Sequence, residues 1–276
     1  MPIQSVFCKV GVFRLSVLSA ALVVALPSFA ASGNQVISSY STTDDMEITS
    51  GAYSLTFGSG EKADFAVFAQ QNARIDMLGN NNFMTVNAKP GNVGVGVEAQ
   101  PGSRVTIGNA NSSTTINVTS DTWIMGVRAG GPGNTGGQGA YVEINGKNLT
   151  VNAESTGTDP GDTVYGLYAQ NASTNAAENE RATLVVNAEN TVINVASGAE
   201  GAASGLVAMS QGILKVNGNL EVNADDAIVA RGGAIVRVNE AGDKTVKLNG
   251  TIDFNFDKAT SGTVADADVL VNLNGA

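Results

Sequence analysis

The sequence contains no histidine, and its single cysteine, Cys8, lies close to the N-terminus. A Ser-His-Asp triad needs an imidazole base, and cysteine nucleophiles and ordinary zinc sites need thiolate or imidazole groups. Beyond residue 8 the chain therefore lacks the side chains for either kind of catalysis and for such a zinc site. It also has no pair of cysteines to form a disulfide, so its stability must come from packing and backbone pairing.

Basic residues are scarce as well. The 15 Lys and Arg face 25 Asp and Glu, which leaves a formal net charge of −10. Nucleic-acid binding needs a positive face, so this balance argues against a nucleic-acid partner. The sequence has no phosphate-binding Gly-Lys-Ser/Thr loop and no Gly-x-Ser-x-Gly nucleophile elbow. We expect no cofactor.

The first thirty residues predict a cleaved signal peptide. Lys9 and Arg14 precede an apolar core at Leu15–Leu26, which is short for a bilayer span of about 20 residues. Ser28 and Ala30 place small residues at the −3 and −1 positions of a signal-peptidase site, so cleavage is expected between Ala30 and Ala31. The alternative is an uncleaved membrane anchor. A cleaved leader predicts an exported protein.

A three-part unit recurs about six times between Phe65 and Phe256. Each unit has a short run that ends in Ala, followed by two alternating apolar runs. Irregular repeats of roughly 20 to 40 residues are typical of stacked, quasi-one-dimensional folds. The alanines that end the first runs are Ala69, Ala99, Ala129, Ala169, Ala208 and Ala230.

Alternation inside the runs has a period of two residues. Val142 and Ile144 flank Glu143, and other charges likewise fall on the phase opposite their apolar neighbours. Three short strands per repeat, separated by corners and Gly/Asn-rich loops, predict a coil of strands that stacks on itself. The outward column of the second strand is predicted to run Asp76, Thr106, Glu143, Val185, Lys215, Arg237, and that of the third Thr85, Asn117, Thr150, Asn194, Glu221, Lys247.

The sequence Val-Asn-Ala, which often ends a repeat unit, recurs at residues 86–88, 151–153, 186–188 and 222–224. Asparagine tolerates left-handed backbone and bonds to nearby backbone groups, which suits a corner. Stacked in register, such side chains can form a ladder, and the alternative is that each simply ends its strand. The candidate ladder or corner residues are Asn87, Asn152, Asn187 and Asn223.

Carboxylate chemistry is the one catalytic route that the composition leaves open. A polysaccharide lyase or hydrolase needs several acids that converge on one outer face, and neither predicted outward column clusters acids. Paired loop acids such as Asp44-Asp45 and Asp225-Asp226 lack the spacing of known calcium loops. We therefore expect neither an enzyme nor a metal site.

The chain divides into four expected segments. Residues 1–30 form the signal peptide, 31–64 an N-terminal lead-in and cap, 65–256 the repeat region, and 257–276 a last partial rung or a truncated continuation. A cap is expected because the open strand edges of a stacked fold invite pairing with other chains. The Gly-rich insertion Gly130–Gly139 and two other long loops explain the widest repeat spacings.

An acidic, exported coil with the motifs Tyr-Gly-Leu-Tyr-Ala-Gln (165–170) and Leu-Thr-Val-Asn-Ala (149–153) resembles the passenger region of bacterial autotransporters, the type V secretion family. The resemblance covers the signal peptide and residues 65–256. It implies an all-β, single-stranded right-handed parallel β-helix, or β-solenoid, here of about six or seven three-strand rungs.

The same resemblance implies an outer-membrane translocator barrel in the full-length protein. No series of amphipathic strands of about ten residues follows Thr260, so we expect a partial passenger. The alternative is a complete, freely exported solenoid. The implied location is the cell surface, the outer membrane or the extracellular space.

The implied function is adhesion or surface structure, with an unknown host surface, matrix or glycan ligand as partner. Two alternatives remain open at the level of the sequence. One is a carbohydrate-active β-helix enzyme, and the other is an inert scaffold whose functional region is missing.

Overall fold

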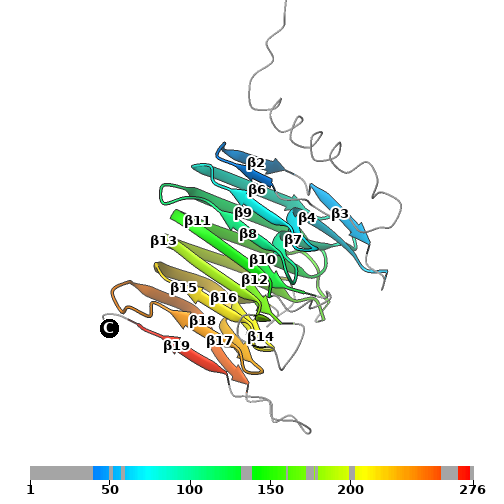
Figure 1. Ribbon diagram of the computed structural model, residues 1–276. Helices are drawn as coiled ribbons and strands as arrows, with labels where there is room; N and C mark the ends of the chain where they lie inside the picture. Colours follow the sequence, from blue (N-terminus) through cyan, green and yellow to red (C-terminus); the bar gives the residue numbers. More distant parts are fainter. Residues whose placement is uncertain are drawn as a thin grey trace, which may run out of the picture.

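The computed structural model describes residues 40–49, 52–56, 60–131, 139–159, 161–171, 177, 180–198, 203–255 and 267–273. Within them the chain is all-β, without a helix, as the alternation predicts. The strands lie side by side in one mostly parallel sheet that does not close into a barrel, and the chain advances along the stack from blue to red (Figure 1). The predicted signal peptide, with Ala30 and Ala31, lies outside the described residues, as do residues 31–39 and 256–266.

The strands pair in three parallel columns. The first contains β4 (Lys62–Ala69), β7 (Val93–Ala99), β10 (Ile124–Gly130), β12 (Val164–Gln170), β14 (Ala203–Met209) and the C-terminal parts of β16 (Asn219–Arg231) and β18 (Val246–Asn255). The second contains β1 (Tyr40–Thr42), β5 (Arg74–Met77), β8 (Arg104–Ile107), the N-terminal parts of β11 (Tyr141–Ser155) and β13 (Thr183–Ser197), β15 (Ile213–Val216), β17 (Ile235–Val238) and β19 (Asp268–Val271).

The third column contains β2 (Met46–Thr49), β6 (Asn81–Asn87), β9 (Ser113–Ser120), the C-terminal parts of β11 and β13, and the N-terminal parts of β16 and β18. A further strand, β3 (Tyr53–Thr56), runs antiparallel to β4 at the N-terminal end of the stack. In each column a strand pairs with the corresponding strand of the next repeat. The repeat seen in the sequence is therefore the unit of stacking.

The alanines that end the first runs form one continuous column. Ala69, Ala99 and Ala129 are direct register partners, and the series continues through Ala169, Ala208 and Ala230. All six are fully buried. A small side chain at the same level of every repeat keeps the interior narrow, as the repeated alanine predicts.

The core lies between the three columns and consists mainly of Val, Ile, Leu and Ala. In β8 the inward residues Val105 and Ile107 are fully buried, whereas Arg104 and Thr106, which alternate with them, are partly exposed. A Cβ built on Gly126 of the first column would lie 2.4 Å from Cγ1 of Val151 in the third. The first and third columns thus face each other across a tightly packed interior.

Four of the predicted strand boundaries are absent from the structure, because β16 and β18 each join a third run to the first run of the next repeat and two further boundaries are lost within rungs. The second and third strands of a rung, predicted as separate runs, are continuous in β11 and β13. The paired register continues across the corner, with Asn145 opposite Asn187 and Asn148 opposite Asn190. Backbone pairing to the neighbouring repeats holds the corner in extended conformation, an effect that a turn-residue pattern does not reveal.

The predicted outward column of the second strand is confirmed in full by the strand register, from Asp76 to Arg237. The predicted column of the third strand is wrong at three of its six levels, those of Thr150, Glu221 and Lys247. Asn117 pairs with Asn152 rather than with Thr150, so Thr150 belongs to a neighbouring column with Glu221. The error is a shift by two residues, which preserves the outward face because side chains alternate with a period of two.

The first column departs from the half-buried pattern, because β7 is buried at every position. On the side away from the third column, Tyr165 and Tyr168 of β12 stack with ring centroids 4.8 Å apart. The Tyr168 hydroxyl donates a hydrogen bond to Oε1 of Gln170 at 2.6 Å. Burial is the main reason that the pKa of Tyr168 rises to about 12, and burial likewise raises the pKa of Tyr53 to about 12.

We expect the protein to lose stability between about pH 10 and about pH 12. An unfolded tyrosine loses its proton near pH 10, so the folded state binds more protons in this interval and the free energy of unfolding falls as the pH rises. Replacing Tyr168 with Phe should make this fall shallower. The measurement is urea unfolding at a series of alkaline pH values. Identical slopes for the Tyr168→Phe variant and the unmodified chain would contradict the assignment.

Candidate functional site

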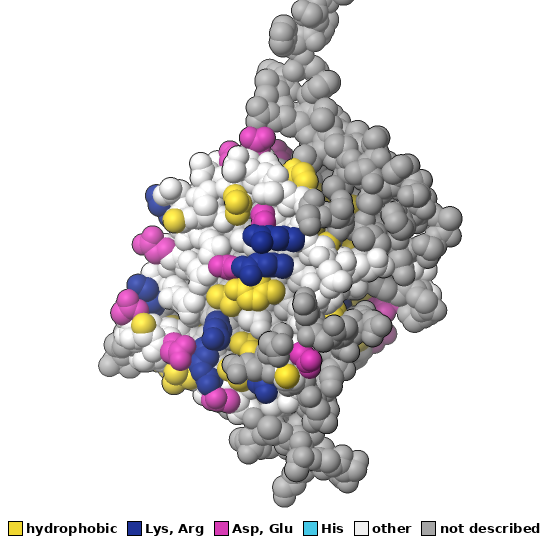
Figure 2. Space-filling model, viewed as in Figure 1, with side chains coloured by type: hydrophobic (Ala, Val, Ile, Leu, Met, Phe, Trp, Pro, Cys, Tyr) yellow, Lys and Arg dark blue, Asp and Glu magenta, His cyan; other side chains and the backbone are white. Residues whose placement is uncertain are grey.

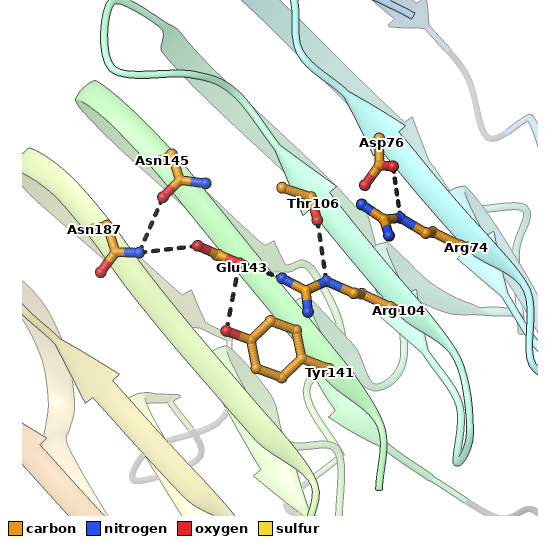
Figure 3. A network of polar contacts seen from close by, with 8 residues as sticks. All are labelled: Arg74, Asp76, Arg104, Thr106, Tyr141, Glu143, Asn145 and Asn187. Atoms are coloured by element: carbon orange, nitrogen blue, oxygen red, sulfur yellow. Dashed lines mark hydrogen bonds and ion pairs between the residues drawn. The ribbon is translucent and has the colours of Figure 1, made fainter. Parts of the chain in front are cut away.

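The outer face of the second column carries a network of charged and polar side chains (Figure 3). Arg74 Nε lies 2.7 Å from Oδ2 of Asp76 on the same strand. One level along the stack, Arg104 Nη2 lies 2.6 Å from Oε2 of Glu143. The Arg104 guanidinium also lies 4.2 Å from the centre of the Tyr141 ring. The contacts of Arg104 thus join adjacent strands on the outside of the stack.

Glu143 is the centre of this network. Besides Arg104, the Tyr141 hydroxyl donates to Oε2 at 3.4 Å and Asn187 Nδ2 donates to Oε1 at 3.3 Å. Burial, followed by the Glu143 carboxylate, raises the pKa of Tyr141, which keeps its phenol protonated as a donor. A carboxylate held by three donors has little capacity left to act as a general acid or base. The arrangement of donors around Glu143 therefore suits a role in holding neighbouring strands together.

The charges on this face are arranged along the stack. Arg74 and Arg104 are direct register partners, and so are Lys215 and Arg237 farther along. Figure 2 shows Lys and Arg side chains gathered in a band on this face of the molecule, interrupted by apolar side chains. The band is a local feature of a chain whose formal net charge is −10.

The third column carries a continuous asparagine ladder on its outer face. Each member donates from Nδ2 to the Oδ1 of the asparagine on the preceding level, at 2.8 Å for the first three contacts and 2.5 Å for the last. The ladder residues are Asn117, Asn152, Asn194, Asn223 and Asn249. Asn117 in turn donates to Oγ1 of Thr85 at 3.4 Å. Side-chain amides thus hydrogen-bond along the same direction as the backbone ladder.

Two shorter asparagine rows run beside this ladder, at the corner between the second and third columns. Asn187 donates to Asn145 at 3.0 Å and Asn217 donates to Asn187 at 2.7 Å. In the other row Asn190 donates to Asn148 at 3.4 Å and Asn219 donates to Asn190 at 2.9 Å. The corner is therefore lined by stacked amides.

The four asparagines selected from the Val-Asn-Ala motif do not form one ladder. Asn152 and Asn223 share the main ladder, where Asn194 lies between them. Asn187 belongs to a corner row, and Asn87 lies level with Thr119, outside the three rows. The motif occurs at two different distances from the corner in different repeats, so equal sequence does not mean equal register. Pairing of whole strands decides which amides meet.

We expect Asn194→Ala to lower the free energy of unfolding by about 1–3 kcal/mol, because the half-buried Asn194 makes two ladder bonds of 2.8 Å. The exposed Asn87 offers a matched control, since Asn87→Ala removes the same side chain outside the ladder. We expect that variant to change stability by less than about 0.5 kcal/mol. Urea unfolding curves of the two variants measure the difference, and equal losses would contradict a stabilising ladder.

A buried ion pair on the first column was missed in the sequence. Glu98 lies on β7 with its side chain 1% exposed, and Arg128 lies on the next strand with its side chain 13% exposed. Arg128 Nη1 lies 3.5 Å from Oε2 of Glu98, and Gln100 Nε2 donates to Oε1 at 3.2 Å. Burial raises the pKa of Glu98, an effect that Arg128 and Gln100 oppose. The available signal was a charged residue inside the apolar run Val95–Ala99.

Paired acids in the described part of the chain have hydrogen-bonding roles of their own. Asp45 accepts from the backbone N–H groups of Asn80 and Asn81 at 2.9 and 3.0 Å. Asp225 accepts from the backbone N–H of Ala203 at 3.3 Å. Among the residues that the structure describes, no group of three His, Cys, Asp or Glu side chains is placed to hold a metal ion. None of the described segments forms a helix suited to crossing a membrane.

Comparison with known proteins gives no match to this chain, whether the comparison is with family models, with curated proteins or with solved structures.

Proposed function

We propose that the chain is an exported, surface-displayed β-helical protein of the autotransporter-passenger type that acts in adhesion or surface structure. In this proposal the three columns belong to a single-stranded right-handed parallel β-helix of about six or seven three-strand rungs. Crossovers between parallel strands of one sheet are right-handed in about 98% of cases, which supports the hand. A translocator barrel carries the chain to the cell surface, and its ligand is a surface, matrix or glycan.

The observation that carries the proposal is a polar face with few charges on the third column, where Glu154 is the charged outward residue of β11. Its outward residues over β9, β11 and β13 are mostly Asn, Thr and Ser, and they stand in register from strand to strand. Each ladder amide has a second N–H and a second oxygen lone pair beyond those used in the ladder. A rigid array of such donors and acceptors suits contact with another polar surface. On β9 these outward residues include Ser113, Thr115 and Asn117, and on β11 their register partners are Asn148, Thr150 and Asn152.

The polar groups of the described outer faces favour this function over carbohydrate-active catalysis. Catalysis needs carboxylates with spare capacity that converge on one cleft. Asp76 and Glu143 of the second column do not converge, because the level of Thr106 separates them; Asp76 pairs through Oδ2 with Arg74, and Glu143 pairs with Arg104. We therefore propose a protein that is not an enzyme and uses no cofactor.

Export can be tested with the full chain in a bacterial host that has an outer membrane. We expect the leader to be removed, so that the N-terminal residue of the exported protein is Ala31. A matched variant with Leu18→Arg in the predicted apolar core should keep its leader and stay inside the cell. Retention of the unmodified chain with an intact leader would contradict the proposal.

Surface contact can be tested by measuring retention of the exported chain on immobilised matrix proteins and glycans. The double variant Thr115→Glu and Thr150→Glu places two like charges on adjacent levels of this polar face, among the Asn, Thr and Ser side chains. We expect it to lose retention, whereas Thr106→Glu on the second column should not. Equal retention of all three proteins, or none for the unmodified chain on any surface, would contradict contact through this face.

A further inference from the structure

A hollow of about 130 Å³ opens on the outer side of the first column, beside the buried ion pair. Its volume is close to that of an engineered cavity of about 150 Å³ that holds a benzene molecule, so it has room for one small group. Its lining draws on three successive strand levels of the stack. The floor is apolar and includes Phe65, Val93, Val95 and Met125.

Charged groups stand around this floor, and negative charge is in excess among them. The hollow is lined by two carboxylates, Glu98 and Glu61, and by one guanidinium, that of Arg128. Arg128 is already 3.5 Å from Glu98 and also lies 5.6 Å from the centre of the Tyr168 ring. Glu61 is exposed, and its charge acts on Glu98 in the direction of raising the pKa of that carboxyl. By formal charge, the lining therefore carries one more carboxylate than guanidinium.

Trp123 completes the lining. It is the only tryptophan of the chain, and it is 43% exposed although it borders an apolar hollow. Indole rings attract cations to their faces, with a strength of about 0.5–1 kcal/mol at exposed sites. Excess negative charge, an indole ring and an apolar floor are the features that recognise a cation with an aliphatic stem.

We propose that this hollow binds an alkylammonium group, that is, an aliphatic chain that ends in a protonated amine. The methylene groups lie on the floor of Phe65 and Val95, and the ammonium group lies toward Glu61 and Trp123. An alkyl carboxylate is disfavoured because it would add a negative charge beside Glu61. A sugar ring is disfavoured because its hydroxyls would lose water against the apolar floor without gaining partners. The net charge of the chain favours the approach of cations.

The single tryptophan provides the readout. The purified full chain is titrated with three probes that share one stem, namely butylammonium, butanol and butyrate, at constant ionic strength. We expect a saturable change of Trp123 fluorescence with butylammonium, with a dissociation constant on the order of 1 mM, and at least about tenfold weaker binding of the other two. Equal or tighter binding of butanol or butyrate would overturn the proposal, as would no saturable change with any probe.

Two variants test the role of charge. Glu61→Gln removes the exposed carboxylate, and we expect it to weaken butylammonium binding about two- to fivefold, the effect of one exposed charge. Glu47→Gln on β2 removes an exposed carboxylate that does not line the hollow and should leave binding unchanged. Circular dichroism checks that both variants keep the unmodified fold. Equal binding by the unmodified chain and Glu61→Gln would overturn the proposal.

Lysine side chains and free polyamines are both sources of an alkylammonium group. A short glycine peptide with one central lysine is therefore compared with a free five-carbon diamine. Tighter binding of the peptide supports a protein partner, and tighter binding of the diamine supports a small-molecule ligand. Failure of both, with butylammonium bound, would overturn a biological role for the hollow. The fluorescence result is independent of export and of surface retention, so the proposed function can fail while this site stands.

Discussion

Leu184→Ala is expected to lower the free energy of unfolding by about 2–5 kcal/mol, the range for truncating a fully buried leucine. Leu184 lies on β13 in the second column, where its register partners are Val142 and Leu214, both also fully buried. The backbone of a stacked sheet is held by pairing on both sides, so the core can collapse only partly around the missing methyl groups. We expect the loss to lie in the upper half of this range.

The neighbouring residue supplies a control. Val185 points outward from the same strand and is only partly buried, so Val185→Ala removes side-chain carbons from the solvent face. We expect a loss below about 1 kcal/mol for it. Urea unfolding followed by circular dichroism gives both values. A loss for Leu184→Ala no larger than that for Val185→Ala would show that the inward and outward phases of β13 have been assigned incorrectly.

Gly166→Ala is expected to destabilise the protein by about 1–3 kcal/mol through overpacking. A Cβ at this position would lie 2.5 Å from Cγ2 of Ile193 and 2.7 Å from the backbone oxygen of Gly205. The Ile193 side chain can shift only within the core, and the Gly205 oxygen belongs to the next strand of the column. The glycine is therefore required for the close approach of the first column to the third, not for an unusual backbone angle.

An exposed glycine provides the comparison for this change. At Gly161 the nearest atom to a built Cβ is Oδ1 of Asp159, at 3.3 Å, and it belongs to an exposed side chain that can move. We expect Gly161→Ala to change the free energy of unfolding by less than about 0.5 kcal/mol. If Gly166→Ala proves equally neutral, the interior between the first and third columns must be more loosely packed than the structure indicates.

The two core variants, Leu184→Ala and Gly166→Ala, also bear on the proposed function. A flat face of amides and hydroxyls can meet another surface only if the backbone beneath it keeps its register. That register rests on the inward residues, such as Leu184 and Ile193, on the other side of the same strands. We expect destabilised core variants to lose surface retention only when they unfold, whereas Thr115→Glu and Thr150→Glu should act on a folded protein.

The repeat was predictable because burial imposes a periodic demand on the sequence. Every level of the stack needs small or branched apolar side chains inward and polar ones outward, so alternation and the recurring alanines appear directly in the residue order. The column from Asp76 to Arg237 could be read in this way because the first residues of its predicted runs are themselves register partners. Which side chains of a strand face inward is decided by their exclusion from solvent, and this can be judged for each strand by itself.

The asparagine rows and the hollow were not predictable on the same basis. Asn152 pairs with Asn194 and Asn187 with Asn145 because whole strands pair across corners, and the repeated Val-Asn-Ala lies at different distances from those corners. Alternation alone would place Glu98 and Arg128 outward in solvent, whereas the structure leaves their side chains only 1% and 13% exposed. Trp123 and Glu61 are far apart in the chain and line one hollow only after stacking.

The sequence by itself determined the strand class, the stacking unit, the narrow aliphatic core and the absence of histidine- and cysteine-based chemistry, because each follows from residue type and local period. The tertiary structure alone decided which polar side chains meet. Contacts between repeats depend on register to within one residue, and register is set by the sum of backbone pairing and core packing over all levels. The asparagine ladder, the Glu98–Arg128 pair and the hollow beside it all depend on that sum.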